Sequence, residues 1–396
     1  MATVVQPAEW VNSSKPKHTM PKVLSSVACN LDNHILLGTL PLFESEKVQA
    51  IEWSFDTLFN FTEIPNWFTE LLQAFSAENR LIGHGVFFSL FSGHWSKEQQ
   101  NWLNQLKKLA SDYTFDHITE HFGFMTGANF HNGAPLSIPF NSTTLAIGQD
   151  RLQRISAACQ CPVGLENLAF SYSLDEVKRH GEFLQKLIEP INGFIILDLH
   201  NLYCQIHNFD ISFDDIIRLY PLERVREIHI SGGSWEDSTV QTDRKVRRDT
   251  HDDSVPVAVF DLLKRALSLC PNLKYVVMEQ LGNGLETAEN RRLFQEDFFK
   301  MDVMIEKHND LGLSNALNTF LPFQFTPLSK KPIQDAFLAK QQRQLSNILE
   351  TATDYADAQR QLAVSNLANT DWDIENWQPY MLETAIQIAQ KWRLGF

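Results

Sequence analysis

The chain has 396 residues, of which 43% are hydrophobic and 21% are charged, and its formal net charge is -14. This length allows one large core with a smaller unit left over, and the composition excludes a largely disordered protein. The negative charge would repel a phosphate backbone, so we expect no nucleic-acid partner.

Membrane and export signals are missing from the sequence. No run of about 18 apolar residues occurs, and residues 1–21 lack the charged and then apolar layout of a signal peptide. We therefore expect a cytoplasmic protein with no membrane contact. The five cysteines are odd in number and lack zinc-finger spacing, so we expect reduced, mostly buried thiols.

Eight short apolar runs, flanked by turn residues, predict eight strands. They cover residues 34–40, 49–55, 81–89, 115–122, 162–167, 194–200, 226–231 and 274–281. Helical spacing between them predicts helices over residues 65–78, 96–111, 148–160, 174–191, 214–219, 254–268 and 285–307. This alternation predicts an α/β fold, a (β/α)8 TIM barrel, although the link between the first two runs is too short for an ordinary helix.

The character of the sequence changes after about residue 311. Residues 319–332 contain three prolines without periodicity, which is typical of a linker or strap. Helical spacing returns over 333–368 and 379–393. We therefore divide the chain into a metal-dependent catalytic barrel, residues 1–310, and a linker with a small helical C-terminal appendage, residues 311–396. The appendage either makes functional contacts, by covering the mouth of the site or by gripping a peptide or partner protein, or it packs on the side of the barrel and stabilises it.

Polar residues at the ends of the predicted strands carry the chemistry, because the active site of such a barrel forms there. They are His84, Glu120, His121, Glu166, Asp198, His229 and Glu279, joined by Asp249 and His251 in one loop. Burying so many ionisable groups without compensation would cost several kcal/mol for each ion, whereas bound cations would stabilise them. Imidazole and carboxylate without thiolate favour iron, manganese or zinc, and the number of candidates implies at least two metals.

Other polar residues have simpler explanations. Glu120 or Asn167 could cap a helix or orient a neighbour. His200 stays undecided, because period two would place it on the strand face of Asp198, as a ligand or as support for one. The remaining histidines are assigned to structural or surface roles: His18, His34, His94, His117, His180, His207 and His308.

Seven segments in order resemble the multinuclear non-haem iron-dependent oxidative enzymes. They are Gly83-His-Gly, Thr119-Glu-His, Leu165-Glu-Asn, Leu197-Asp-Leu-His-Asn-Leu-Tyr, the segment 222–232 ending in Ile-His-Ile-Ser-Gly, Asp249-Thr-His and Met278-Glu. The resemblance implies two or three mixed-valence irons that use dioxygen to oxidise a ribosomally made precursor peptide, often at cysteine. The iron ligands it implies are His84, His121, Glu166, Asp198, Asn201, His229, Asp249, His251 and Glu279. The chain departs from that pattern at Gly233, where a histidine is usual, and at Asp252.

The first hypothesis is therefore an iron-dependent, dioxygen-dependent oxidase or oxygenase acting on a precursor peptide, with Glu166, Asp198 and His229 at the reacting centre. Whether a separate recognition protein delivers the peptide is left open. Two alternatives remain. One is a divalent-metal isomerase, epimerase or phosphodiesterase of the xylose-isomerase-like barrels, and the other is a non-catalytic scaffold for a peptide or partner.

Overall fold

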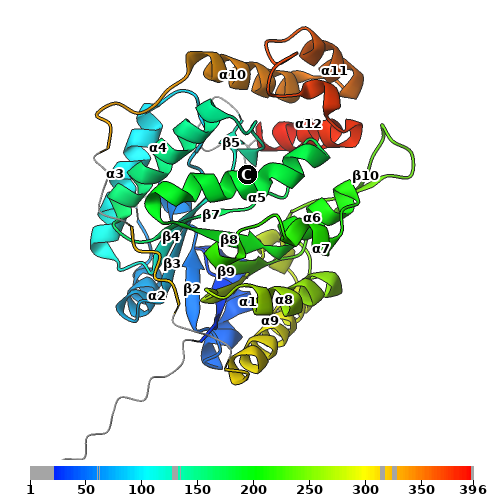
Figure 1. Ribbon diagram of the computed structural model, residues 1–396. Helices are drawn as coiled ribbons and strands as arrows, with labels where there is room; N and C mark the ends of the chain where they lie inside the picture. The colour runs from blue at the N-terminus through cyan, green and yellow to red at the C-terminus, as the bar shows by residue number, and fades with distance from the viewer. Residues whose placement is uncertain are drawn as a thin grey trace, which may run out of the picture.

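The computed structural model describes residues 22–59, 61, 63–126, 133, 135–312, 317–322 and 328–393. Eight parallel strands close into a barrel with helices around it (Figure 1), which confirms the predicted TIM-barrel fold. In their order around the barrel the strands are β1 (Leu24–Ala28), β12 (Tyr275–Met278), β9 (Val225–Ile230), β8 (Phe194–Asp198), β7 (Val163–Glu166), β4 (His117–His121), β3 (Leu81–Gly85) and β2 (Ala50–Trp53).

The predicted first strand is wrong. Residues 34–40 lie in helix α1 (Asn33–Glu44), and the strand that opens the barrel is β1. The Asp32 carboxylate starts α1 by accepting hydrogen bonds from the amides of His34 and Ile35. β1 was missed because two serines interrupt its apolar run; the Ser25 hydroxyl donates to Asp302 of α9 at 2.7 Å. With β1 in place, α1 is the helix that links the first two strands.

All seven predicted barrel helices are present, with their ends shifted by some residues. They are α2 (Asn66–Ala77), α3 (Lys97–Asp112), α4 (Ser142–Cys159), α5 (Leu174–Ile188), α7 (Phe213–Ile217), α8 (Val257–Leu269) and α9 (Ala288–Asp310). α4 begins well before the predicted residue 148 because Asn141 and Thr144 form a capping box. Helix α6 (Leu199–Phe209) was not predicted; it follows β8 directly, with Asp198 as its N-cap.

Shorter elements complete the described chain. Two small antiparallel pairs lie outside the barrel sheet: β5 (Phe124–Met125) with β6 (Pro135–Leu136), and β10 (Trp235–Asp237) with β11 (Lys245–Arg247). The 3-10 turns are η1 (Phe55–Leu58), η2 (Glu189–Ile191), η3 (Leu222–Arg224), η4 (Gly282–Leu285) and η5 (Ile374–Asn376).

Three strands place apolar residues inside the barrel before their ends. Ala50, Ile82 and Val277 belong to a small buried cluster that is separate from the main core between sheet and helices. Alternate residues of a strand face the same side. The residue two positions beyond each of these therefore also faces the axis. These residues are Glu52, His84 and Glu279, so each of the three strands presents a polar group to the interior near its end.

The C-terminal helices lie over the strand ends. Trp377 stacks on Tyr172 with ring centroids 3.7 Å apart, and the Gln342 amide donates to the Phe91 carbonyl at 2.8 Å. Tyr172 and Phe91 lie in the loops after β7 and β3, so the appendage covers this end of the barrel (Figure 1). Its helices are α10 (Ala336–Thr351), α11 (Tyr355–Ala363) and α12 (Pro379–Arg393).

Two further expectations concern the thiols and the membrane. All five cysteines are free, and four of them are buried while Cys161 is partly exposed. Within the ranges that the structure describes, no helix combines the length and the apolar character that a membrane crossing requires. The division of the chain at residue 310 stays a prediction, and His18 and residues 323–327 of the linker lie outside the described residues.

Candidate metal centre

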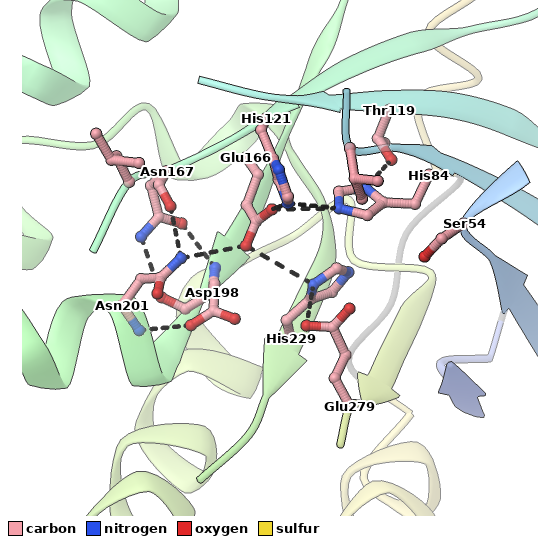
Figure 2. A network of polar contacts seen from close by, with 12 residues as sticks. Ser54, His84, Thr119, His121, Glu166, Asn167, Asp198, Asn201, His229 and Glu279 are labelled. Carbon is pink, nitrogen blue, oxygen red and sulfur yellow. Dashed lines mark hydrogen bonds and ion pairs between the residues drawn. The ribbon is translucent and has the colours of Figure 1, made fainter. Parts of the chain in front are cut away.

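One side of the barrel mouth brings two imidazoles and a carboxylate together. His84 Nε2 lies 3.0 Å from His121 Nε2, and the Oε2 atom of Glu166 lies 3.4 Å from the first nitrogen and 3.1 Å from the second. The Thr119 hydroxyl is 2.8 Å from His84 Nδ1 and fixes that ring, so that Nε2 faces its neighbours (Figure 2). Three potential ligand atoms from β3, β4 and β7 thus converge on one point.

His229 of β9 lies beside this group. Its Nδ1 atom is 3.1 Å from Glu279 Oε2 and 4.0 Å from Glu166 Oε1. Its Nε2 atom is 3.2 Å from Glu52 Oε2 and 3.1 Å from Glu227 Oε1. Nδ1 is therefore the nitrogen that faces the barrel mouth, while Nε2 is held by carboxylates deeper in the barrel.

Four overlapping groups of three residues could each hold a cation. Within each group the potential ligand atoms lie within 4.8 Å of one another. Each of Glu166, Asp198, His229 and Glu279 belongs to two groups, and the three carboxylates among them could each bridge two ions. The groups are His84, His121 and Glu166; Glu52, His229 and Glu279; Glu166, Asp198 and His229; and Asp198, His251 and Glu279.

Buried polar atoms without hydrogen bonds show that these residues fit a multivalent cation. Unpaired buried polar atoms are costly, and each would gain a partner from a metal ion. Among the described residues the atoms without an acceptable hydrogen bond include Glu166 Oε2, Asp198 Oδ2, Asn201 Oδ1, His229 Nδ1, His251 Nε2 and both carboxylate oxygens of Glu52.

Burial shifts the protonation of the candidate ligands. It raises the pKa of Glu52 and Asp198 well above the usual range and lowers the pKa of His84 to about 4. At His251 burial acts in the same direction, but the Asp249 carboxylate outweighs it and raises the pKa to about 10. Protons and cations therefore compete for these carboxylates, so metal binding would release protons.

Asp249 lies between His200 and His251. The Asp249 Oδ1 atom lies 3.0 Å from His200 Nδ1 and 2.9 Å from His251 Nε2. His200 lies on α6 and not on a strand, and its Nε2 accepts from Arg247 Nε at 3.1 Å. Both ring nitrogens of His200 are therefore engaged within the protein. Asp249 belongs to none of the four groups, although the resemblance implies it as a ligand.

His251 has an unusual backbone conformation. Its φ is +50°, in the left-handed region that residues other than glycine seldom adopt, and its carbonyl accepts from the Leu281 amide at 2.8 Å. Such strain persists only where the surroundings impose it, and it is frequent at functional sites. Here it directs the imidazole toward Glu279 and Asp198.

Asn201 orients two of the carboxylates. Its side-chain amide donates to Glu166 Oε1 at 3.1 Å and to the Asn167 carbonyl at 2.8 Å, and its backbone amide donates to Asp198 Oδ1 at 2.5 Å (Figure 2). Asn167 donates to the Asp198 carbonyl at 3.1 Å. The first turn of α6, which follows β8 directly, thus fixes the free oxygens of Glu166 and Asp198 toward the metal groups.

A cavity of about 370 Å³ opens above these residues. His84, His121, Glu166, His251 and Glu279 line its floor. The walls are mainly apolar, and several of their side chains come from α12. A pocket with an apolar wall and a few convergent polar groups is the usual form of a small-molecule or peptide site.

Comparisons with known proteins identify the family. Residues 45–286 match the model of the family described as RiPP precursor modification enzyme MbnB/TglH/ChrH. The chain belongs to this family. Among its curated relatives, a UPF0276 protein of Acaryochloris marina is 26% identical over 199 residues, covering 50% of this chain and 68% of that protein. One from Alcanivorax borkumensis is 24% identical over 251 residues, covering 60% and 80%.

Solved structures share the barrel at low identity. An L-ribulose 3-epimerase is 10% identical with a TM-score of 0.49, covering 74% of this chain and 97% of that one. Endonuclease IV from Thermus thermophilus is 13% identical with a TM-score of 0.44, covering 69% and 98%. At such scores the likeness says nothing about the reaction.

Gly233 stands where the resemblance leads us to expect a histidine. A Cβ atom there would lie 2.3 Å from the Arg248 carbonyl and 2.9 Å from the His200 ring. The loop after β9 packs so closely on the loop that carries Asp249 and His251 that no side chain fits. Any third metal would therefore need other ligands. Glu52 is the one carboxylate of the four groups that the resemblance does not assign as a ligand.

The sequence analysis missed two carboxylates in the barrel. Glu52 lies two residues after the interior Ala50, and Glu227 two residues before His229, so period two would have placed both on the interior face. Glu227 Oε2 lies 2.5 Å from His117 Nε2, and His117 Nδ1 lies 2.9 Å from Asp116 Oδ2. This buried series extends from His229 toward the start of the barrel.

Glu120 takes no part in the groups. Neighbouring His121 faces the axis, so Glu120 faces the helices, where a Cβ atom on Gly85 would lie 1.8 Å from its Oε1 and 3.1 Å from the Trp102 ring. Burial raises the pKa of Glu120 well above its usual range. Glycine at position 85 leaves space for its side chain.

Proposed function

We propose that this protein is a multinuclear non-haem iron enzyme that uses dioxygen to oxidise a residue of a ribosomally made precursor peptide. Membership of a family of precursor-modifying enzymes supports the peptide substrate. The observation that carries the proposal is the convergence of imidazole and carboxylate atoms that lack hydrogen bonds. No cysteine joins these groups among the described residues, and imidazole with carboxylate suits iron better than a copper(I) or iron–sulfur site.

The metal-holding roles follow the four groups. His84, His121 and Glu166 would hold one ion, and Asp198, His251 and Glu279 another. Glu166 and His229 lie between these two positions, and a third ion would use Glu52. Asn201 is a further candidate ligand through its free Oδ1, and Asp249 is another, because its Oδ1 faces His251 Nε2, the nitrogen that would bind the ion.

The protein's own groups prepare this centre. Glu227 holds His229 Nε2 by a hydrogen bond, so that Nδ1 stays directed at the mouth. Asn201 holds Glu166 and Asp198, the two carboxylates that we place with His229 at the reacting centre. When bound, iron supplies electron transfer to dioxygen, which side chains cannot perform. Whether a second protein delivers the peptide is part of the same proposal.

Metal content tests this function. We expect protein reconstituted anaerobically with ferrous iron to retain about two irons per chain, given the eight residues of the four groups and some bridging, and to show a ferric absorption band after exposure to air. Protein that retains only zinc, manganese or magnesium after this treatment would favour the divalent-metal isomerase or phosphodiesterase alternative. A precursor peptide that serves as substrate should change mass only with iron and dioxygen present.

A further inference from the structure

Helix α12 presents one line of side chains to the cavity above the metal groups. Met381, Thr384, Ile388 and Lys391 all line it, together with Trp392. Their spacing of three, four and three residues places them along one face of a helix. This helix lies outside residues 45–286, the part that matches the family. The chain therefore adds its own wall to a cavity whose floor belongs to the shared barrel.

Other contacts fix this wall against the barrel. Glu383 accepts hydrogen bonds from the Ser238 hydroxyl at 2.7 Å and the Thr239 amide at 3.0 Å. The Tyr380 hydroxyl donates to the Asn208 carbonyl at 2.5 Å. Because these partners lie in the β10–β11 hairpin and at the end of α6, the position of α12 relative to the metal groups is set by direct contacts with the loops of the barrel.

Apolar side chains from the barrel loops also line the cavity. They include Met125, Leu168 and Phe170, and Met381 and Ile388 add apolar surface from α12. Such a channel would desolvate an apolar segment of a substrate that reaches the floor. Because α12 supplies part of that surface, the size of its side chains limits which segments can enter.

Cations are among the residues that line the cavity, although the protein is strongly acidic. Arg248 and Lys391 both line it. Arg248 pairs with Glu236 and donates to Gln387 of α12 at 3.3 Å. Lys391 is exposed and has neither an ion pair nor a hydrogen bond with any residue in the described ranges. A free cation beside a desolvated cavity attracts a carboxylate.

We propose that α12 selects the substrate. Met381, Thr384 and Ile388 contact an apolar segment of a peptide, and Lys391 binds a carboxylate of the same peptide, from an acidic side chain or the C-terminus. This inference rests on the proposed function, because it takes the substrate to be a peptide.

Peptide selection on the whole protein tests it. Iron-loaded full-length protein is immobilised and incubated with a synthetic library of random short peptides, half of which have an amidated C-terminus. We expect the wild type to enrich peptides with a carboxylate over peptides with Lys or Arg. Lys391→Glu should lower that preference about tenfold, because an attractive charge becomes repulsive. Enrichment that survives amidation assigns the carboxylate to a side chain, whereas its loss assigns it to the C-terminus.

The control is Arg393→Glu. Arg393 is an exposed cation on the same helix that donates to the Glu350 carbonyl and does not line the cavity. It should leave the preference unchanged. A second variant, Ile388→Trp, should shift enrichment toward smaller apolar residues while iron content stays at the wild-type value.

Three outcomes would overturn the inference. Equal effects of Lys391→Glu and Arg393→Glu would show that the preference reflects only the net charge of the protein. An unchanged preference in Lys391→Glu would show that Lys391 of α12 does not bind the carboxylate. Both leave the proposed function intact. If the iron-loaded wild type enriches no peptide at all, the peptide substrate itself is contradicted and the inference fails with it.

Discussion

Glu166 occupies the middle of the candidate metal centre. Its Oε2 atom faces His84 and His121, while Oε1 accepts from Asn201 and lies 4.0 Å from His229 (Figure 2). No other side chain among the described residues joins the β3 and β4 histidines to the remaining groups. The two oxygens thus face two different groups, which is the geometry of a bridging carboxylate.

Replacing this bridge should reduce metal binding. We expect Glu166→Gln to lower iron content to about one ion or fewer per chain and to abolish peptide oxidation, because an amide is a weaker ligand than a carboxylate. The circular dichroism spectrum should not change, since a strand-end carboxylate does not hold the barrel together. Glu120→Gln is the matched control, because Glu120 is buried on the next strand but faces the helices. Wild-type iron content in Glu166→Gln would contradict the bridging role.

His180 gives a pH dependence away from the metal groups. Burial lowers its pKa to about 3, and its Nε2 accepts from the Leu168 amide at 3.1 Å, which requires the neutral ring. The unfolded chain has the higher pKa and binds the proton first. The contribution of His180 to stability is therefore complete above pH 6.5 and decreases as the pH falls toward 3.

This decrease can be measured by difference. Linkage predicts that wild type loses about 2 kcal/mol of unfolding free energy from this residue between pH 7.5 and 5. His180→Gln, whose amide oxygen can accept the same hydrogen bond, should lose correspondingly less over that interval. Urea unfolding of metal-free protein at the two pH values provides the comparison. Equal losses in both proteins would show that His180 is protonated in the folded state.

At the scale of elements, close packing of helices on the barrel depends on a few glycines. A Cβ atom on Gly181 of α5 would lie 2.0 Å from the Leu219 carbonyl. One on Gly38 of α1 would meet only ordinary contacts, at 3.4 Å or more from Leu285 and its neighbours. The same substitution should therefore have opposite effects in the two helices.

Gly181→Ala should destabilise the protein by about 2 kcal/mol, because α5 must move away from the backbone beside it. Gly38→Ala should be neutral or should stabilise by up to about 1 kcal/mol, because alanine has the higher helix propensity. Chemical unfolding of both variants checks the pair. A stable Gly181→Ala would mean that α5 is not packed as closely as the contact with Leu219 indicates.

At the scale of the whole molecule, the centre concentrates carboxylates inside a protein that is already acidic. Glu166, Asp198 and Glu279 converge at the barrel mouth, with Glu52 deeper in the barrel, in a chain with net charge -14. Their repulsion and burial oppose folding when no cation is bound. Metal binding and folding should therefore be coupled.

We expect ferrous iron to raise the melting temperature and a chelator to lower it. An ion present at a hundredfold excess over its Kd stabilises the folded state by about 2.7 kcal/mol. Anaerobic calorimetry with and without iron measures the shift, and Asp198→Asn should reduce it. A melting temperature that changes with neither iron nor chelator would argue against a metal centre at these residues.

The sequence by itself determined the architecture and most of the ligand candidates. Alternating apolar runs and helical stretches predicted the barrel, because each β/α unit leaves that periodicity in the chain. The polar residues at the strand ends then predicted the ligand candidates His84, His121, Glu166, His229 and Glu279, because the C-terminal ends of all the strands lie at the same end of a parallel barrel.

Only the tertiary structure decided which strand opens the barrel and what completes the site. Residues 34–40 and β1 were confused because a short apolar run fits a helix or a strand equally well until its partners are known. Glu52 and Glu227 were recognised beside His229 only when the structure showed which residues face the barrel interior. The contact of His200 with Asp249 was recognised only when the structure placed His200 on α6. The position of α12 over the mouth depends on contacts more than 130 residues apart, such as Glu383 with Thr239 at a separation of 144, which no local pattern encodes.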